Sequence, residues 1–384
     1  MTVGADFSQT IEWLEALVAI DTQNPPGSEL AAARWLADAL SAFGLAARVD
    51  EVLPGRANVV AELRNGDGRT FAFNSHIDVV PVGEGWSSDP FRLTEKDALL
   101  FGRGACDAKG SIAAMLSAVR WLAAERGAWH GTLLAAFVAD EETESRGAKA
   151  YAGMRPAIDY VVIGEPTSNA VVTAHKGSLR PIVAVTGLAA HSGTPDLGVN
   201  AIYGAAKVLE LVEREHRDHV SQRFHPLCDA ASLTVTRIHG GHADNVVPER
   251  CDLMLDRRMI PGEDEAAVKR EIGNLLGRAR AEHGIVADIV GYQPTTGGAT
   301  ETDASHPIVQ AALAAVASHG VSPPGPHGFK GGCDLVHFRS IGAQGVVIGP
   351  GSLAVAHKPD EFVPKDELQT ASAIYRDLAL AMLR

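Results

Sequence analysis

Residues 131–142 read GTLLAAFVADEE, an apolar run that ends in three consecutive carboxylates. An apolar run without polar alternation is typical of a strand that is covered on both faces, as the strands of parallel sheets are. The runs TFAFNSH (70–76) and DYVVIG (159–164) have the same character. Apolar residues at helical spacing predict a long helix from about Lys109 to Arg126. This alternation predicts an α/β domain with a largely parallel sheet flanked by helices.

The pattern changes after residue 177. The runs at 180–188, 232–241 and 251–259 alternate between apolar and polar residues, and helices are expected between them, near 200–215 and 263–283. The α/β pattern returns with a helix expected at 306–319, the run QGVVIG and a terminal helix from about Lys365. We therefore predict one domain split into residues 1–177 and 291–384, interrupted by a smaller α+β domain, residues 178–290.

Composition and charge exclude several classes of protein. The 384 residues carry a net charge of −13 without a lysine- or arginine-rich block, so a nucleic-acid partner is not expected. No apolar run reaches membrane-spanning length, and the first residues, MTVGADFSQTIEWLEAL, lack the pattern of a signal peptide. The cysteines are far apart, which argues against a disulfide framework. We expect a soluble cytoplasmic protein with reduced thiols at Cys106, Cys228, Cys251 and Cys333.

Polar side chains follow the apolar runs where the predicted strands end. In open α/β sheets ligands bind beyond the carboxyl ends of the strands, so these side chains are expected at one edge. Burying several carboxylates together without a cation is very unfavourable. A pair of divalent metal ions would resolve this. The candidates are His76, Asp78, Asp107, Glu141, Glu142, Glu165 and His357.

Each candidate also has a plainer interpretation when it is taken alone. Asp107 could cap the long helix, and Glu141 could be a solvated strand end. His76 and Asp78 stand two residues apart, so on an extended segment they would point the same way. They could form a simple histidine–carboxylate contact or the orienting contact of a metal ligand. The pair alone does not distinguish these interpretations.

The motif set resembles that of the dinuclear zinc hydrolases that include acetylornithine deacetylase, succinyl-diaminopimelate desuccinylase, aminoacylase and glutamate carboxypeptidase. The resemblance follows the family's order and covers nearly the whole chain. Further segments, AHKG, GVNAI and IHGG, look most like acetylornithine deacetylase. The motifs that carry the family resemblance are SHIDVVP, GRGACDAKG, ADEETESRGA, IGEPTS and GPGSLAVAHKPDEF.

The resemblance implies a metal centre with two zinc ions, for which cobalt can substitute. Asp107 would bridge the two ions. His76 and Glu165 would be the other ligands of one ion, and Glu142 and His357 would be the other ligands of the second ion. Zinc binds imidazole nitrogen and carboxylate oxygen readily. Glu141 matches the general base of the family, and an extended segment would turn it away from Glu142. Asp78 would accept a hydrogen bond from the second nitrogen of His76.

The inserted domain also matches the family, as a lid that forms a homodimer. His191 corresponds to a histidine that reaches the partner subunit's active site and stabilises the oxyanion. Asn245 and Arg258 match positions that hold the substrate carboxylate, for which arginine is well suited. The neighbouring Arg257 is expected on the opposite face of its strand, in solvent.

These observations together predict a metal-dependent amidohydrolase that cleaves an N-acyl, and foremost an N-acetyl, amino acid. Alternatives within the family are a desuccinylase, a carboxypeptidase or dipeptidase, and a catabolic amidohydrolase. A non-catalytic metal-binding relative is a further alternative, but it would be free to lose Glu141 or a ligand, and none is missing. In the segment FKGGCDLVHF, Cys333 stands where relatives commonly have a small hydroxyl residue. The sequence therefore does not identify the substrate, whose pocket would be shaped by His327, Lys330 and Cys333.

Overall fold

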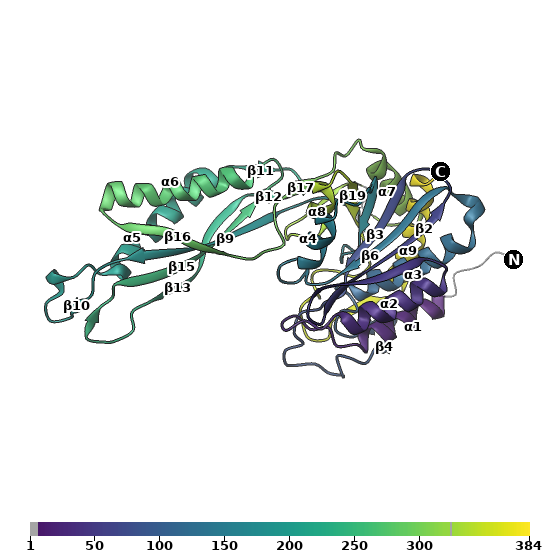
Figure 1. The fold of residues 1–384 in the computed structure, drawn as a ribbon, viewed down its shortest axis with the longest axis horizontal. Coiled ribbons are helices and arrows are strands. Elements are labelled where there is room, and N and C mark those ends of the chain that lie inside the picture. The colour runs from purple at the N-terminus through teal and green to yellow at the C-terminus, as the bar shows by residue number, and fades with distance from the viewer. Residues whose placement is uncertain (1–6, 323–324) are drawn as a thin grey trace. The chain divides into compact units, whose positions relative to one another are not determined.

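The computed structural model describes residues 7–322 and 325–384 (Figure 1). The part of the signal-peptide prediction that concerns residues 1–6 lies outside them. The chain forms two compact units: unit 1 comprises Met1–Thr173, Thr302–Gly328 and Cys333–Arg384, and unit 2 comprises Ala174–Glu301 and Phe329–Gly332. The limits of 178 and 290 inferred from the sequence fall inside unit 2, because residues beyond 290 still bond to it. Thr295, for example, donates to the Ser178 carbonyl at 2.8 Å.

The central sheet of unit 1 is mixed, with a parallel centre. Strands β6, β3, β7 and β19 run parallel in that spatial order, and they include the apolar runs identified in the sequence. Strands β1 and β2 extend this sheet antiparallel, since a two-residue turn joins them and such a turn reverses the chain. The bounds are β1 Ala46–Leu53, β2 Arg56–Asn65, β3 Thr70–His76, β6 Gly131–Val138, β7 Tyr160–Ile163 and β19 Gln344–Val347.

Helices flank this sheet (Figure 1). Helix α3 is buried along nearly its whole length because α1, α9 and β3 all pack against it, and Phe71, Phe73 and Tyr375 belong to the same apolar core. A three-stranded sheet of β4 (Thr94–Lys96), β5 (Leu99–Phe101) and β20 (Phe362–Pro364) brings the C-terminal segment beside residues 99–101. The helices are α1 Phe7–Val18, α2 Leu30–Ala42, α3 Lys109–Ala124, α4 Arg146–Gly153, α7 Pro307–Ser318, α8 Leu335–Ser340 and α9 Lys365–Met382.

Unit 2 has an antiparallel sheet in the order β13-β15-β9-β16, packed against helices α5 and α6. Strand β8 (Val172–His175) leads into β9. The bounds are α5 Ala201–Glu215, α6 Glu265–His283, β9 Gly177–Thr186, β13 Ser232–Gly240, β15 Arg250–Met259 and β16 Val286–Gln293. Short pairs join β10 (Ala190–His191) to β14 (Val246–Val247), and β11 (Phe224–His225) to β12 (Asp229–Ala230). Across residues 7–322 and 325–384, no helix combines the length and apolarity needed to span a membrane.

The prediction for Arg257 is wrong. Its side chain is fully buried in unit 2 and pairs with Glu263 at 2.5 Å. The strand does turn it to the face opposite Arg258, but that face is covered by the segment that carries Glu263 and by α6. A buried guanidinium is tolerated there because Glu263 neutralises its charge.

Candidate metal centre

The ends of three parallel strands bring the first candidate residues to one edge of the sheet. His76 is the last residue of β3, and it pairs in register with Val138, the last residue of β6. Strand β7 ends at Ile163, level with Asn74 of β3. The turn that carries Glu141 and Glu142 and the loop that carries Glu165 therefore leave the sheet beside His76.

Distances among these side chains fall into two groups that share Asp107. His76 Nε2 lies 3.1 Å from Asp107 Oδ1 and 3.8 Å from Glu165 Oε2. His357 Nε2 lies 3.3 Å from Asp107 Oδ2 and 3.1 Å from Glu142 Oε2. The two oxygens of Asp107 thus face different histidines, which is the arrangement that a bridging carboxylate requires.

The carboxylates of this cluster are buried, and their pKa values shift accordingly. Burial, reinforced by the charge of Asp107, raises the pKa of Glu142 to about 7. Burial likewise raises the pKa of Glu165 to about 7. Hydrogen bonds to Asp107 and Glu142 raise the pKa of His357 to about 10. Without a metal ion, protonated histidines are the cations that face these carboxylates; a divalent cation in their place would favour the charged form of the carboxylates.

The donor set fits a pair of zinc ions. Imidazole nitrogen and carboxylate oxygen are ordinary zinc donors, and two histidines with several carboxylates supply them here. Glu142 Oε1 is buried and has no hydrogen-bond partner among the described residues. Two groups of donor atoms could each hold an ion: the first is His76, Asp107 and Glu142, and the second is His76, Glu141 and Glu165. A metal ion would give the orphaned oxygen of Glu142 a partner.

Asp78 does not make the contact expected from the sequence. His76 Nδ1 is bonded to the main-chain carbonyl of Asp78 at 2.9 Å, whereas the carboxylate oxygen is 3.8 Å away. The strand ends at His76, so the alternation of an extended chain no longer applies at Asp78. The carboxylate instead accepts the main-chain N–H groups of Glu141 at 3.0 Å and Glu142 at 3.2 Å. Asp78 therefore holds the turn that carries both glutamates.

Glu141 and Glu142 lie in a turn rather than on an extended segment. His76 lies near both, but their other neighbours differ: Glu142 contacts His357, while Glu141 is grouped with Glu165. Burial, followed by the charge of Glu165, raises the pKa of Glu141 well above its usual range. The turn, and not strand alternation, separates the two carboxylates.

The candidate residues of unit 2 lie at its two ends. His191 of β10 pairs with Val246 of β14, and the Asn245 carbonyl accepts the Ser192 N–H at 2.9 Å, so His191 and Asn245 are neighbours. Arg258 lies near the end of β15, whose first residue is Arg250; at about 3.3 Å per residue it is roughly 26 Å along that strand. Within the described part of one chain, Arg258 is thus not brought to His191. Its guanidinium pairs with Asp256 at 2.7 Å.

The three residues that the sequence analysis links to substrate specificity, His327, Lys330 and Cys333, have different surroundings. Lys330 is exposed and pairs with Asp229 at 2.6 Å within unit 2. Cys333 is buried in unit 1, and burial raises the pKa of its thiol, with the charge of Glu165 adding to the effect. His327 Nε2 is buried and has no hydrogen-bond partner among the described residues. The thiol of Cys333 is therefore electrostatically coupled to Glu165, one of the candidate metal ligands.

Sequence reasoning missed three residues around the cluster: Asp334, Arg103 and Glu361. Asp334 is buried, and burial raises its pKa to about 7. Glu361 accepts hydrogen bonds from the main chain at Asp107, and Arg103 pairs with Glu361. The signals for Arg103 and Glu361 were present, because both stand inside quoted motifs, GRGACDAKG and AHKPDEF. Nothing local indicated that these motifs meet.

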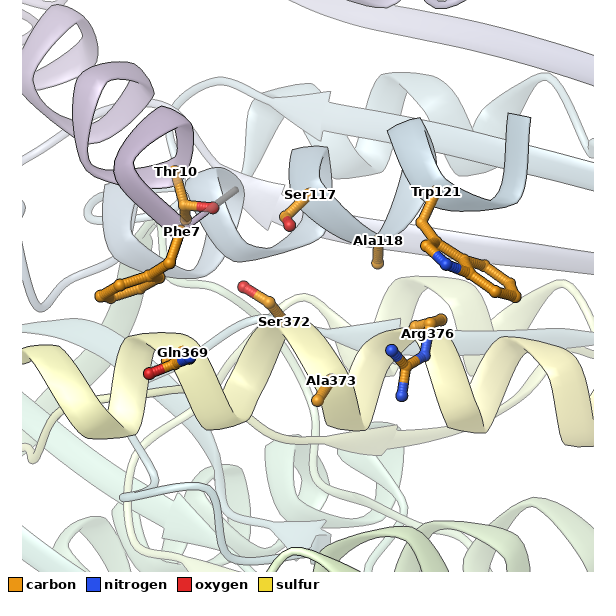
Figure 2. Close-up of a pocket in the computed structure, with 9 residues that line it drawn as sticks. All are labelled: Phe7, Thr10, Ser117, Ala118, Trp121, Gln369, Ser372, Ala373 and Arg376. Atoms are coloured by element: carbon orange, nitrogen blue, oxygen red, sulfur yellow. The ribbon is translucent and has the colours of Figure 1, made fainter. Parts of the chain in front are cut away.

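A separate cavity of about 210 Å³ lies between α1, α3 and α9 (Figure 2). Arg376 is the charged residue among the nine that line it, and its guanidinium is already paired with Asp377 at 2.7 Å. All predicted site residues lie in the described part of the chain, and none lines this cavity. The lining residues are Phe7, Thr10, Ser117, Ala118, Trp121, Gln369, Ser372, Ala373 and Arg376.

A parallel-centred α/β sheet whose edge carries two histidines and several buried carboxylates is suited to bind divalent metal ions. A profile of peptidase family M20/M25/M40 matches residues 72–381. Probable succinyl-diaminopimelate desuccinylase of Staphylococcus epidermidis is 30% identical over 403 residues, covering 97% of each chain. Acetylornithine deacetylase of Myxococcus xanthus is 34% identical over 378 residues, covering 94% of each. The chain belongs to peptidase family M20/M25/M40.

Solved structures show the same fold. Aminopeptidase PepT from Bacillus cereus matches with a TM-score of 0.82 and 22% identity over 99% of each chain. The YXEP protein of Bacillus subtilis, described as a dinuclear metal-binding peptidase of the M20 family, matches with a TM-score of 0.75 and 19% identity over 98% of each. The predicted family and α/β fold class are confirmed, and the protein is an enzyme that hydrolyses amide bonds.

Proposed function

We propose that this enzyme cleaves the acyl group from an N-acyl amino acid, with an N-acetyl substrate as the first choice, and that it uses two zinc ions. The observation that carries the proposal is the two-sided contact of Asp107 with His76 and His357 at the sheet edge. The acetylornithine deacetylases among its relatives support the choice of substrate class.

Asp107 would bridge the ions, with His76 and Glu165 on one and Glu142 and His357 on the other. The bound ions would supply Lewis-acid charge that acidifies water and polarises the substrate carbonyl. Glu141, held in its turn by Asp78, would take a proton from water and pass it to the departing amine. Burial of Glu141 keeps this proton transfer away from bulk solvent.

The substrate carboxylate would bind Arg258 of one chain and Asn245 of the partner subunit. His191 would stabilise the oxyanion, and we propose that it acts across a homodimer. Two observations support the dimer: His191 and Asn245 are separated from Arg258 along one chain, and several large apolar side chains, called here the apolar patch, are exposed on the segments around His191. Leu197 and Tyr203 are each 73% exposed. Contiguous exposed apolar surface is typical of an interface. The rest of the apolar patch is Leu188, Val199, Ile202 and Ile238.

A desuccinylase is the second candidate, because a probable succinyl-diaminopimelate desuccinylase is 30% identical over nearly the full length. Lys330 is a cation that could favour an acidic acyl group, but it is already paired with Asp229. Free, buried thiols at all four cysteines agree with the cytoplasmic location that we propose. The amidohydrolase proposal does not depend on that location.

A hydrolysis panel tests the proposed function. Purified enzyme loaded with zinc or cobalt is offered N-acetyl, N-succinyl and N-formyl amino acids and dipeptides, and the free amine is measured. We expect the highest kcat/KM for an N-acetyl amino acid. A clear preference for N-succinyl substrates would establish the second candidate instead. Hydrolysis of dipeptides alone would contradict both.

A further inference from the structure

A buried ion pair of Arg103 and Glu361 lies beside the backbone of Asp107, and neither residue is itself a candidate metal ligand. Arg103 and Glu361 are each 1% exposed, and their side chains meet at 2.5 Å. Glu361 Oε1 accepts the main-chain N–H groups of Cys106 at 3.0 Å and Asp107 at 2.9 Å. The carboxylate therefore holds the backbone at the residue that contacts both histidines.

Arg103 also bonds to two other loops. Its guanidinium donates to the carbonyls of Pro81 at 3.3 Å and Val82 at 3.2 Å, in the segment that follows His76 and Asp78. It donates to the Lys358 carbonyl at 3.3 Å, directly after His357. One guanidinium thus connects three segments that are far apart in the sequence and that each carry a candidate ligand.

Because Arg103 and Glu361 are buried, their side chains depend on these particular hydrogen-bond partners. An unpaired charge in the interior is strongly unfavourable, so Arg103 is held by its acceptors and Glu361 by its donors. Hydrogen bonds that involve a charged group are shorter and stronger than neutral ones. The fork of the guanidinium lets it reach separate acceptors at once, which a lysine ammonium does less well.

We infer that Arg103 and Glu361 are positioning residues that set the distance between the two metal sites by holding the loops of Asp107 and His357 in register. The inference rests on the proposed dinuclear centre. It differs from a purely structural role because the same pair fixes the shared carboxylate and one terminal ligand. Loss of the pair should therefore weaken both metal sites together, rather than one.

The matched control is the buried pair of Arg257 and Glu263 in unit 2. It has the same length, 2.5 Å, and Glu263 also accepts a main-chain N–H, from Ile260 at 2.9 Å. Glu361→Gln and Glu263→Gln each replace a carboxylate that pairs with a guanidinium and accepts a main-chain N–H by a neutral amide with a single acceptor oxygen. Each should lower the melting temperature. Only Glu361→Gln should change metal binding.

The experiment measures zinc and cobalt affinity of the full-length protein by competition with a chelating dye, with thermal unfolding of the metal-free protein alongside. Substitution of groups that orient metal ligands typically lowers metal affinity by about 10–100-fold. We expect a loss of that size at both sites for Glu361→Gln. Arg103→Lys keeps the charge but loses part of the fork, so we expect a smaller loss. Activity of Glu361→Gln should recover substantially at saturating cobalt.

The outcomes separate this inference from the proposed function. Wild-type protein that binds no metal pair would refute both. Wild-type protein that binds two ions, with unchanged affinities in Glu361→Gln and Arg103→Lys, would refute the positioning role alone. Selective loss of one ion would also overturn it. If Glu361→Gln does not fold, the milder Arg103→Lys decides the question by the same measurement.

Discussion

Glu141 and Glu142 are consecutive carboxylates with different surroundings. Glu142 contacts His357 and has a buried oxygen without a partner among the described residues, which suits a metal ligand. The main-chain N–H groups of both are held by Asp78. At the scale of single residues, the roles of the Glu141 and Glu142 carboxylates thus depend on the direction that one short turn gives to each side chain.

Glu141→Gln should retain both metals and lose activity. A general base typically contributes about 10²–10⁴-fold, and the amide of glutamine cannot accept the proton. The measurement is kcat together with metal content by elemental analysis. Glu142→Gln is the matched variant and should weaken the binding of one metal ion. The opposite pattern of metal loss would reverse the two roles.

Asp78→Asn should destabilise the turn of the two glutamates. Both carboxylate oxygens accept hydrogen bonds, and Oδ2 also accepts one from Asn24 at 2.8 Å. An asparagine would turn its NH₂ group toward at least one of these donors. A buried group without its partner costs about 1–3 kcal/mol. We expect a lower melting temperature and a lower kcat, and an unchanged kcat would show that Asp78 does not position Glu141.

At the scale of elements, helix α3 supports the turn that carries Asp107. Gly110 lies in the first turn of this helix, and a Cβ added there would stand 2.4 Å from the Ala105 carbonyl oxygen. That distance is far below ordinary contact, so the backbone around Asp107 would have to move. The helix and the turn therefore fit together only without a side chain at position 110.

Gly110→Ala should lower both stability and metal affinity. Overpacking of a filled interior costs about 1–3 kcal/mol, and the displaced turn includes the shared carboxylate. The control is Gly273→Ala in α6, where a Cβ meets nothing within 4 Å. There alanine should stabilise the helix by about 0.5–1 kcal/mol. Thermal unfolding and dye competition measure both effects, and equal behaviour of the two variants would contradict the close fit.

At the scale of the whole molecule, the candidate residues are divided between two units. The candidate metal ligands lie in unit 1, whereas His191, Asn245 and Arg258 lie in unit 2. A unit tethered at both ends is suited to closure around a substrate. The exposed apolar patch near His191 is the surface through which we expect two copies to associate.

Mixing two inactive variants tests this assembly. Glu141→Gln lacks the base and His191→Ala lacks the oxyanion contact, but a mixed dimer would contain one site with both groups. If subunits exchange freely in equal amounts, about a quarter of all sites regain activity, provided that the oxyanion contact acts locally. Sedimentation should show a dimer. A monomer at assay concentration, or no recovery after proven exchange, would leave His191 as an ordinary loop residue.

Metal removal tests the centre as a whole. Dialysis against a chelator should abolish activity, and zinc or cobalt should restore it as about two ions bind per chain, the number expected for a paired-metal site. Metal content and activity are followed together during reloading. Full activity of the metal-free enzyme would contradict the mechanism.

Much of the architecture could be predicted from local patterns. The apolar runs that become β3, β6 and β7 and the helix that becomes α3 are recognisable because each buries itself along its own length. The residues that follow these runs could be predicted as a cluster, since parallel strands bring their ends to one edge. Order and spacing along the chain therefore indicated the fold class and the set of candidate ligands, and the resemblance of the motifs indicated the family.

The tertiary structure decided what each side chain contacts. The carboxylate of Asp78 contacts the glutamate turn because its strand had already ended, and Arg257 is buried because the segment that follows β15, with Glu263, folds back over it. Arg103 and Glu361 are 258 positions apart, and they meet because β20 pairs with β5. Such contacts depend on which segments pack together. Periodicity and motif spacing describe one segment at a time, so they carry no information about the partner that packing supplies.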